Sequence, residues 1–295
     1  MTVGIGDDAA VLAPEGGSLV WTVDAAVEGV HFRRDWMSLE DIGFRSLMAA
    51  ASDLAAMGAR PRGVLCALVL PADFGDDELD QIARGQADAT SALGTAVVGG
   101  NLSRGTELSL TTTVLGAAKH PLLRAGARPG DVVAVAGPLG LAAAGIAALQ
   151  TKQRGPAVER AIAAYRRPRA LIEAGALAAS RAHAAIDVSD GLTLDVSRLA
   201  AESSVSIVLE AKNVRAVGGN DLRAAAEALS LDALELALHG GDDYALVMAF
   251  APADVAPPFV RIGTCAAGRG ISLLGEDGAV HPLEPRGFDH FRGAQ

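Results

Sequence analysis

Strand-like apolar segments alternate with longer helical segments along the whole chain, and this order limits the possible folds more than any other feature. The pattern predicts helices from about 38 to 58, over 76–93, over 141–149 and from 192 through 199, with an Arg-rich helical region over 154–169. It predicts strands over 19–24, 64–70, 96–101, 108–115, 132–136, 184–187 and 244–250, the third ending in a turn at Gly99-Gly100. This alternation indicates the α/β (α+β) class.

The length of 295 residues suggests two domains. A polar, turn-rich stretch over 124–131 is the candidate junction, which gives an N-terminal domain over 1–120 and a C-terminal domain over 121–295. Half of the residues are apolar, so a substantial core is available. The formal net charge of −10 argues against nucleic acid and anionic membranes as partners.

One charge-free run, over 132–149, is long enough to suggest a membrane span. It is interrupted by Gly137-Pro138-Leu139-Gly140, which favours a buried strand, a turn and an Ala-rich helix instead. No signal peptide opens the chain, so a cytoplasmic location is expected. Cys66 and Cys265 lie far apart in the sequence and indicate neither a zinc site nor a disulfide framework.

Acidic residues recur in settings of glycine and other small residues. They are Asp7-Asp8 within Gly4–Val11, Asp24, Asp53, Asp187, Asp190 and the pair Asp242-Asp243. Carboxylates that share one cleft repel each other and raise one another's pKa, and a divalent cation removes that penalty. Oxygen ligands of this kind suit Mg²⁺. The pattern therefore predicts a magnesium-dependent phosphoryl-transfer enzyme.

For two of these settings, the predicted secondary structure around the acid favours a role as a metal ligand. Thr22 and Asp24 are two residues apart in a predicted strand, so their side chains leave the same face. Asp53 is expected in the last turns of a helix, where a carboxylate is unfavourable unless a cation is near.

Other candidates have two interpretations from the residues alone. Asp187 and Asp190 flank a strand-to-helix turn whose backbone N–H groups suit anions, but Ser189 or Asp190 is equally suited to cap the helix. Arg124 is either a phosphate clamp or part of the linker. Neither G-x-x-x-x-G-K-[ST] nor H-R-D occurs, so a kinase of the two common types is not indicated.

Taken together, the motifs resemble those of the thiamine-monophosphate kinase family, in the aminoimidazole-ribonucleotide-synthetase superfamily. They are Gly4–Val11, Ser52-Asp53-Leu54-Ala55-Ala56-Met57-Gly58-Ala59, Ile186–Leu192, Gly240-Gly241-Asp242-Asp243-Tyr244 and Gly287-Phe288-Asp289-His290-Phe291. The resemblance covers essentially the whole chain. It implies a two-domain fold, with an N-terminal domain that supplies a dimer-forming β-barrel and an α/β C-terminal domain that closes the site. It also implies transfer of the ATP γ-phosphate to thiamine monophosphate by a homodimer.

The resemblance further implies roles for individual residues. The magnesium ligands would be Asp8, Thr22, Val23, Asp24, Asp53, Asn101, Asp187 and Asp190, of which Asp8, Asp53 and Asp187 would act in catalysis through the metal. Gly100, Asn101, Arg124 and Ser189 would contact ATP. His31, Asp242 and Phe288 would line the thiamine-phosphate side.

Three departures from the family pattern stand out. Asn101 replaces the usual Asp, Asp242 replaces the usual Glu, and the chain begins almost at the glycine-acid turn, ahead of which the family carries a further segment. Two alternatives therefore accompany the kinase interpretation. One is a sister ATP-dependent synthetase with a different acceptor. The other is a non-catalytic protein that binds nucleotide or thiamine phosphate.

Overall fold

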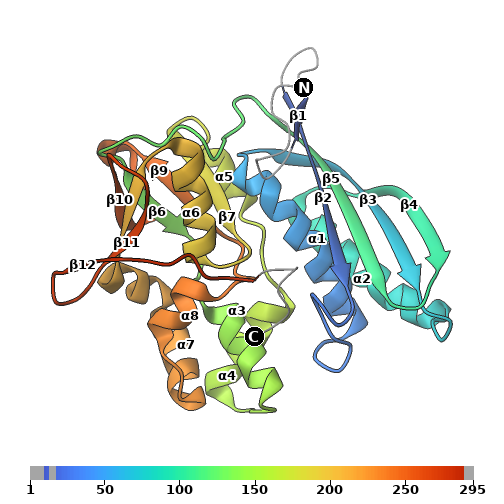
Figure 1. Cartoon of the computed structure of the whole chain (residues 1–295). Coiled ribbons are helices and arrows are strands. Elements are labelled where there is room, and N and C mark those ends of the chain that lie inside the picture. Colours follow the sequence, from blue (N-terminus) through green and yellow to red (C-terminus); the bar gives the residue numbers. More distant parts are fainter. Residues whose placement is uncertain (1–9, 13–17, 289–295) are drawn as a thin grey trace. The chain divides into compact units, whose positions relative to one another are not determined.

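The computed structural model describes residues 10–12 and 18–288, and the chain folds into two compact units (Figure 1). The first unit contains the chain up to Pro121 together with Arg166–Ala176. The second contains Leu122–Tyr165 and the chain from Leu177 onward. The first unit thus includes a short segment that divides the second unit in the sequence.

The first unit is a five-stranded sheet with two long helices. Its elements are β1 (Ala10–Leu12), β2 (Ser18–Val27), α1 (Leu39–Ala56), β3 (Arg60–Leu70), α2 (Asp76–Leu93), β4 (Val97–Arg104) and β5 (Ser109–Ala118). The strand order is β1-β2-β5-β3-β4. Only the β3–β4 pair of this sheet is parallel, and α2 forms the crossover that such a pair requires. Among the described residues this sheet is open, so the barrel implied for a dimer stays a prediction.

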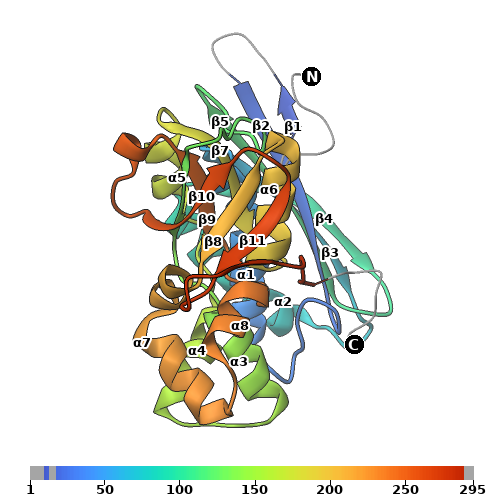
Figure 2. The ribbon, with the colours of Figure 1, turned by 60° about the vertical axis from the view of Figure 1, so that its left-hand side comes forward.

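The two faces of this sheet differ. Helix α1 packs against β2, β5 and β3 and also contacts α2 (Figure 2). It buries Leu47, Leu54 and their apolar neighbours. The alternate positions of the strands carry exposed apolar side chains, among them Trp21 at 46% and Leu65 at 44%. Because alternate residues of a strand point to opposite faces, these side chains share the face that α1 does not cover.

The expected turn at Gly99-Gly100 is wrong, because both glycines lie within β4, which continues to Arg104. Gly100 is paired with Cys66 of β3, and a Cβ atom at Gly100 would lie 1.8 Å from the Cys66 carbonyl oxygen. Gly100 therefore allows two strands to approach closely and does not mark a change of chain direction. Close backbone approach is a common reason for a glycine inside a strand.

The second unit is built on a seven-stranded mixed sheet in the order β12-β11-β8-β10-β6-β9-β7. Its strands are β6 (Val132–Ala136), β7 (Ala182–Val188), β8 (Ser206–Glu210), β9 (Ala245–Phe250), β10 (Val260–Ala266), β11 (Gly270–Leu274) and β12 (Val280–Pro282). Its helices are α3 (Leu141–Gln150), α4 (Pro156–Arg166), α6 (Leu192–Ser203), α7 (Ala211–Leu229) and α8 (Ala233–His239), with a short 3₁₀ helix over Pro252–Asp254. Helix α5 (Ile172–Ala178) contains the point in the sequence where the chain passes from the first unit to the second. Strands β6 and β9 are buried along their whole length, which explains their unbroken apolar sequences.

The charge-free run over 132–149 folds as predicted, into strand β6, a turn and helix α3. Strand β6 is buried along its whole length, and helix α3 buries half of its residues within the second unit. Among the described residues, no helix is both long enough and apolar enough to cross a membrane.

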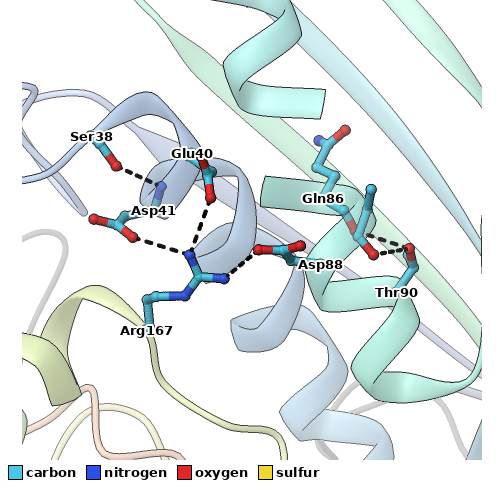
Figure 3. Close-up of polar contacts among 8 residues, drawn as sticks. Ser38, Glu40, Asp41, Gln86, Asp88, Thr90 and Arg167 are labelled. Carbon is cyan, nitrogen blue, oxygen red and sulfur yellow. Dashed lines mark hydrogen bonds and ion pairs between the residues drawn. The ribbon is translucent and has the colours of Figure 1, made fainter. Parts of the chain in front are cut away.

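Arg167 anchors the late segment of the first unit to its two helices (Figure 3). Its guanidinium lies 2.8 Å from Asp88 of α2 and 3.4 Å from Asp41 of α1, with Glu40 at 3.6 Å. The same group lies over the ring of Phe44, 4.1 Å from its centroid. One side chain therefore contacts both helices through charge and through stacking.

We expect Arg167→Ala to lower the free energy of unfolding by about 1–2 kcal/mol, because partly exposed ion pairs contribute little individually and the aromatic contact adds to them. Denaturant unfolding at low and high salt measures the change, which should shrink as salt screens the ion pairs. Arg169→Ala, an exposed arginine in the same segment, is the matched control and should change stability by less than about 0.5 kcal/mol. Equal losses in the two variants would contradict the anchoring role.

Candidate active site

In the first unit, the fold brings two of the predicted ligands into direct contact. The Thr22 hydroxyl of β2 donates a hydrogen bond to the carboxylate of Asp53, which lies in the last turn of α1. That turn contains no basic residue, so the local field of the helix terminus does not favour the charge of Asp53. Asp24 is exposed two residues along the same face of β2, and its carboxylate accepts a hydrogen bond from the Ala25 N–H at 3.0 Å.

The other first-unit candidates are more dispersed. Asn101 lies on β4, with three strand spacings between it and β2, and its amide donates to Ser103 at 3.1 Å. The sheet register puts Asn101 in one row with Ala67 and Ala25, one residue out of step with Asp24, so Asn101 projects from the opposite face. His31 accepts a hydrogen bond on Nδ1 from the Val27 N–H at 3.1 Å. The structure does not bring Asn101 to Thr22 and Asp53 within this unit.

In the second unit, three motifs that are far apart in the sequence converge. The loop after β7, the loop before β9 and the C-terminal segment after β12 are joined by backbone hydrogen bonds. The Asp242 N–H donates to the Ser189 carbonyl at 2.8 Å, and the Phe288 N–H donates to the Asp190 carbonyl at 2.9 Å. The sequence-predicted residues Ser189, Asp190, Asp242 and Phe288 are therefore held together.

Glycines make this convergence possible. A Cβ atom at Gly241 would lie 2.4 Å from the Ser189 carbonyl oxygen, and one at Gly287 would lie 2.3 Å from the Asp190 carbonyl oxygen. Neither position has room for a side chain unless the backbone moves. The glycines that precede Asp242 and Phe288 are therefore needed because only a residue without a side chain allows the backbones to pack this closely.

Helix α6 starts at Leu192 with no side chain capping it from Ser189 or Asp190, so the capping alternative for these residues is not observed. Asp195, in the first turn, accepts hydrogen bonds from the N–H groups of Asp190 and Gly191, both at 3.1 Å. These two N–H groups lie in the turn that was predicted to suit an anion, and both already donate to the Asp195 carboxylate. Burial raises the pKa of Asp195 to about 7, and the nearby Asp190 carboxylate adds to the shift.

Arg198 links these two acids one turn further along α6. The same guanidinium nitrogen lies 2.7 Å from a carboxylate oxygen of Asp190 and 2.7 Å from one of Asp195. The site residues predicted from the sequence include neither Asp195 nor Arg198. An acid in the first turn of a helix, followed three residues later by Arg, was the available signal, but it indicates ordinary helix stabilisation as readily as site support.

The adjacent acids Asp242 and Asp243 have different environments. Asp243 is buried, and its carboxylate accepts from the N–H groups of Gly140 at 2.5 Å and Ala142 at 3.1 Å, at the start of α3. Burial raises its pKa to about 7, although these bonds oppose the shift. Asp242 has a φ of +65° and accepts a hydrogen bond from the Tyr244 hydroxyl at 3.1 Å. Asp243 thus fixes α3, while Asp242 remains the substrate-side candidate.

The remaining candidates also belong to the second unit. Asp187 is buried near the end of β7, where its strand pairs with β9. Arg124 lies just inside the second unit, and its carbonyl accepts a hydrogen bond from Ser203 at the end of α6 at 2.7 Å. Asp8 lies outside the described residues.

The candidate metal ligands are therefore divided between the units. Thr22, Val23, Asp24, Asp53 and Asn101 belong to the first, and Asp187 and Asp190 belong to the second. Among the described residues, no three His, Cys, Asp or Glu side chains form a metal-binding group by themselves. The donors are nevertheless all oxygen atoms, and the Thr22–Asp53 contact already pairs two of them, so the donor set is chemically suited to Mg²⁺.

Comparison with known proteins identifies the fold. Residues 6–118 match the family model of the AIR synthase related protein N-terminal domain, and residues 128–273 match that of the C-terminal domain. A thiamine-monophosphate kinase from Rhodopirellula baltica is 32% identical over 307 residues, covering 98% of this chain and 92% of that protein. One from Aquifex aeolicus is 32% identical, covering 97% of this chain and 92% of that protein.

A solved structure agrees with these matches. AaThiL complexed with AMPPCP and TMP has a TM-score of 0.91 at 31% identity, covering 97% of this chain and 92% of that chain. The two-domain α/β fold expected from the resemblance is thereby confirmed. The chain belongs to the thiamine-monophosphate kinase family of AIR synthase related proteins.

Proposed function

We propose that this protein is a thiamine-monophosphate kinase that transfers the γ-phosphate of ATP to thiamine monophosphate, giving thiamine diphosphate and ADP. The observation that carries the proposal is its likeness, along 97% of its length, to a structure that holds AMPPCP and TMP. The convergence of Ser189, Asp190, Asp242 and Phe288 in the second unit supports it, because these residues come from motifs assigned to the two substrates.

The acceptor of this reaction is itself a phosphate, already anionic at neutral pH, so it needs no general base. The barrier lies in holding two polyanions in line, and positioning together with charge neutralisation should supply most of the catalysis. The protein has a net charge of −10 and must gather positive charge locally. Bound Mg²⁺ would neutralise the charge of the phosphate oxygens. We propose as its ligands Asp8, Thr22, Val23, Asp24, Asp53, Asn101, Asp187 and Asp190.

The remaining proposed site residues bind the two substrates. Gly100, Asn101, Arg124 and Ser189 are proposed to contact ATP, and His31, Asp242 and Phe288 to contact thiamine monophosphate. Phe288 suits this assignment because its side chain is 45% exposed, although its backbone is tied to Asp190. A partly exposed aromatic ring is chemically suited to stacking on an aromatic ligand.

A coupled assay of ADP release separates this proposal from its alternatives. We expect ADP release that depends on thiamine monophosphate, with thiamine diphosphate as the product. A sister synthetase would release ADP only with a different acceptor, and a binding protein would bind ligand without turnover. We also expect direct transfer, so trapping a covalently phosphorylated residue during turnover would contradict the mechanism.

We also propose that the protein is a homodimer that buries the exposed face of the first-unit sheet against a second copy. Trp21, Val23 and Leu65 are 46%, 62% and 44% exposed on that face. Contiguous apolar side chains on a monomer surface typically mark an interface. A second copy would offer an identical apolar face, as two-fold symmetry requires.

Leu65→Lys should therefore weaken the dimer, raising its dissociation constant roughly a hundredfold, since each of two copies loses about 1.5 kcal/mol of apolar burial. Analytical ultracentrifugation measures the constant. Leu231→Lys in the second unit is the matched control, because Leu231 is 43% exposed and lies outside that face. The dimer proposal fails if wild-type protein sediments as a monomer at micromolar concentration.

A further inference from the structure

The hydroxyl of Thr193 is the centre of a hydrogen-bond network formed by Thr193, His239 and Arg286, called the knot below. This network links helix α6, helix α8 and the C-terminal segment. Thr193 is fully buried in the first turn of α6. Its Oγ1 lies 2.9 Å from Nδ1 of His239, the last residue of α8, and 2.8 Å from the carbonyl oxygen of Arg286. The Arg286 N–H also points to this oxygen, at 3.1 Å. Figure 1 shows the segment after β12 passing between these two helices.

The number of protons available in this knot determines the protonation state and the tautomer of His239. Thr193 has a single hydroxyl proton, which it donates to the Arg286 carbonyl because that oxygen can only accept. The Arg286 N–H and the imidazole Nδ1 must then both donate to Oγ1. The other imidazole nitrogen, Nε2, lies 2.8 Å from a guanidinium nitrogen of Arg286, which can only donate. His239 is therefore neutral, with its proton on Nδ1 and an acceptor at Nε2.

The position of the knot links it to a candidate substrate residue. Arg286 is two residues before Phe288, whose N–H donates to the Asp190 carbonyl at 2.9 Å. Between them lies Gly287, which approaches Asp190 so closely that it has no room for a Cβ atom. The two ends of this three-residue segment are thus fixed, one by Thr193 and His239 and the other by Asp190.

We propose that Thr193 and His239 are positioning residues that hold Phe288 in place for the thiamine-phosphate substrate. This inference rests on the proposed function for the identity of that substrate. Neither side chain needs to touch the substrate. Both act through the backbone and guanidinium of Arg286, so their loss should loosen the segment that carries Phe288 while leaving the ATP-contacting candidates Asn101 and Arg124 unchanged.

The charges around His239 agree with this arrangement. Burial lowers the pKa of His239, and the facing Arg286 guanidinium lowers it further, while Glu235 at 3.7 Å opposes the shift. Arg286 also pairs with Glu235 at 3.1 Å. Because protonation removes the acceptor at Nε2, the knot should weaken as the pH falls below about 6.5, the ordinary pKa of histidine.

Hydrogen exchange at the Phe288 amide tests the inference without any need for catalysis. Thr193→Val keeps the shape of the side chain but removes the hydroxyl and its three hydrogen bonds. We expect exchange at Phe288 to become at least roughly tenfold faster, because the loss of a single net hydrogen bond already accounts for about that factor. Thr193→Ser keeps the hydroxyl and should stay near the wild-type rate. Thr151→Val is the matched control, since its hydroxyl donates at the exposed end of α3, away from the knot.

Two further measurements separate positioning from general structure. Steady-state kinetics of Thr193→Val should show a several-fold higher KM for thiamine monophosphate and an unchanged KM for ATP. Exchange at Phe288, corrected for intrinsic chemistry, should accelerate in the wild type as the pH falls below about 6.5 and should lose this dependence in His239→Gln. The Thr193→Ser variant should recover the wild-type KM.

The inference is overturned if Thr193→Val exchanges at Phe288 at the wild-type rate, or if its KM rises equally for both substrates. These outcomes are distinct from failure of the proposed function, which would appear as wild-type protein that does not phosphorylate thiamine monophosphate. In that case the exchange rates of the Thr193 variants still decide whether the knot fixes the Phe288 segment.

Discussion

Asp53→Asn is expected to reduce the rate of ADP release at least roughly a hundredfold, because a metal ligand supplies several kcal/mol of charge stabilisation in the transition state. The fold should survive, since an asparagine amide oxygen can still accept the hydrogen bond that Thr22 donates. Removal of a negative charge from the last turn of α1 should not destabilise the helix either. The loss should therefore concern catalysis alone.

Thermal unfolding with and without Mg²⁺ and ATP checks this separation. Wild-type protein should melt at a higher temperature when both ligands are present, because a ligand that binds only the folded state stabilises it. Asp53→Asn should match the wild type without ligands and show a smaller rise with them. Asp80→Asn, an exposed acid on α2, is the control for charge removal. Near wild-type activity of Asp53→Asn would remove Asp53 from the metal site.

Asp243→Asn should produce the largest stability change among the acidic motif residues, a loss of about 2–4 kcal/mol near pH 4, because the buried carboxyl group, to which two N–H groups donate, is replaced by an amide that adds donors of its own. In a protein of this size we expect a melting temperature lower by roughly 5–10 °C. The neighbouring variant Asp242→Asn is the control. It should unfold close to the wild type, because Asp242 is only half-buried and its amide replacement can still accept from Tyr244.

The pH dependence of this loss has a defined sign. Burial raises the folded-state pKa of Asp243 to about 7, above the unfolded value near 3.8. The folded protein therefore holds this proton more tightly, so the contribution to stability is full below about pH 4 and is lost as the pH rises to about 7. The difference in the free energy of unfolding between wild type and Asp243→Asn should be greatest near pH 4 and smaller at pH 8. A constant difference across this range would contradict the assignment.

Local pattern was sufficient for much of the fold. The predicted helix over 76–93 has the same bounds as α2, and the strand over 132–136 has the same bounds as β6. These segments succeed because amphipathic spacing and unbroken apolar runs report burial directly. The Gly99-Gly100 prediction fails because glycine serves turns and close strand approach equally well.

The order of the acid and glycine motifs along the chain determined the family, since composition, charge and motif spacing are properties of the sequence itself. The tertiary structure decided which acid of each group has which role. Asp243 accepts from the N–H groups at the start of α3 while its neighbour Asp242 does not, and Asp195 accepts from the turn N–H groups that were predicted to suit an anion. A carboxylate's role depends on the donors and the burial that distant segments bring to it, and those partners are set only when the chain folds.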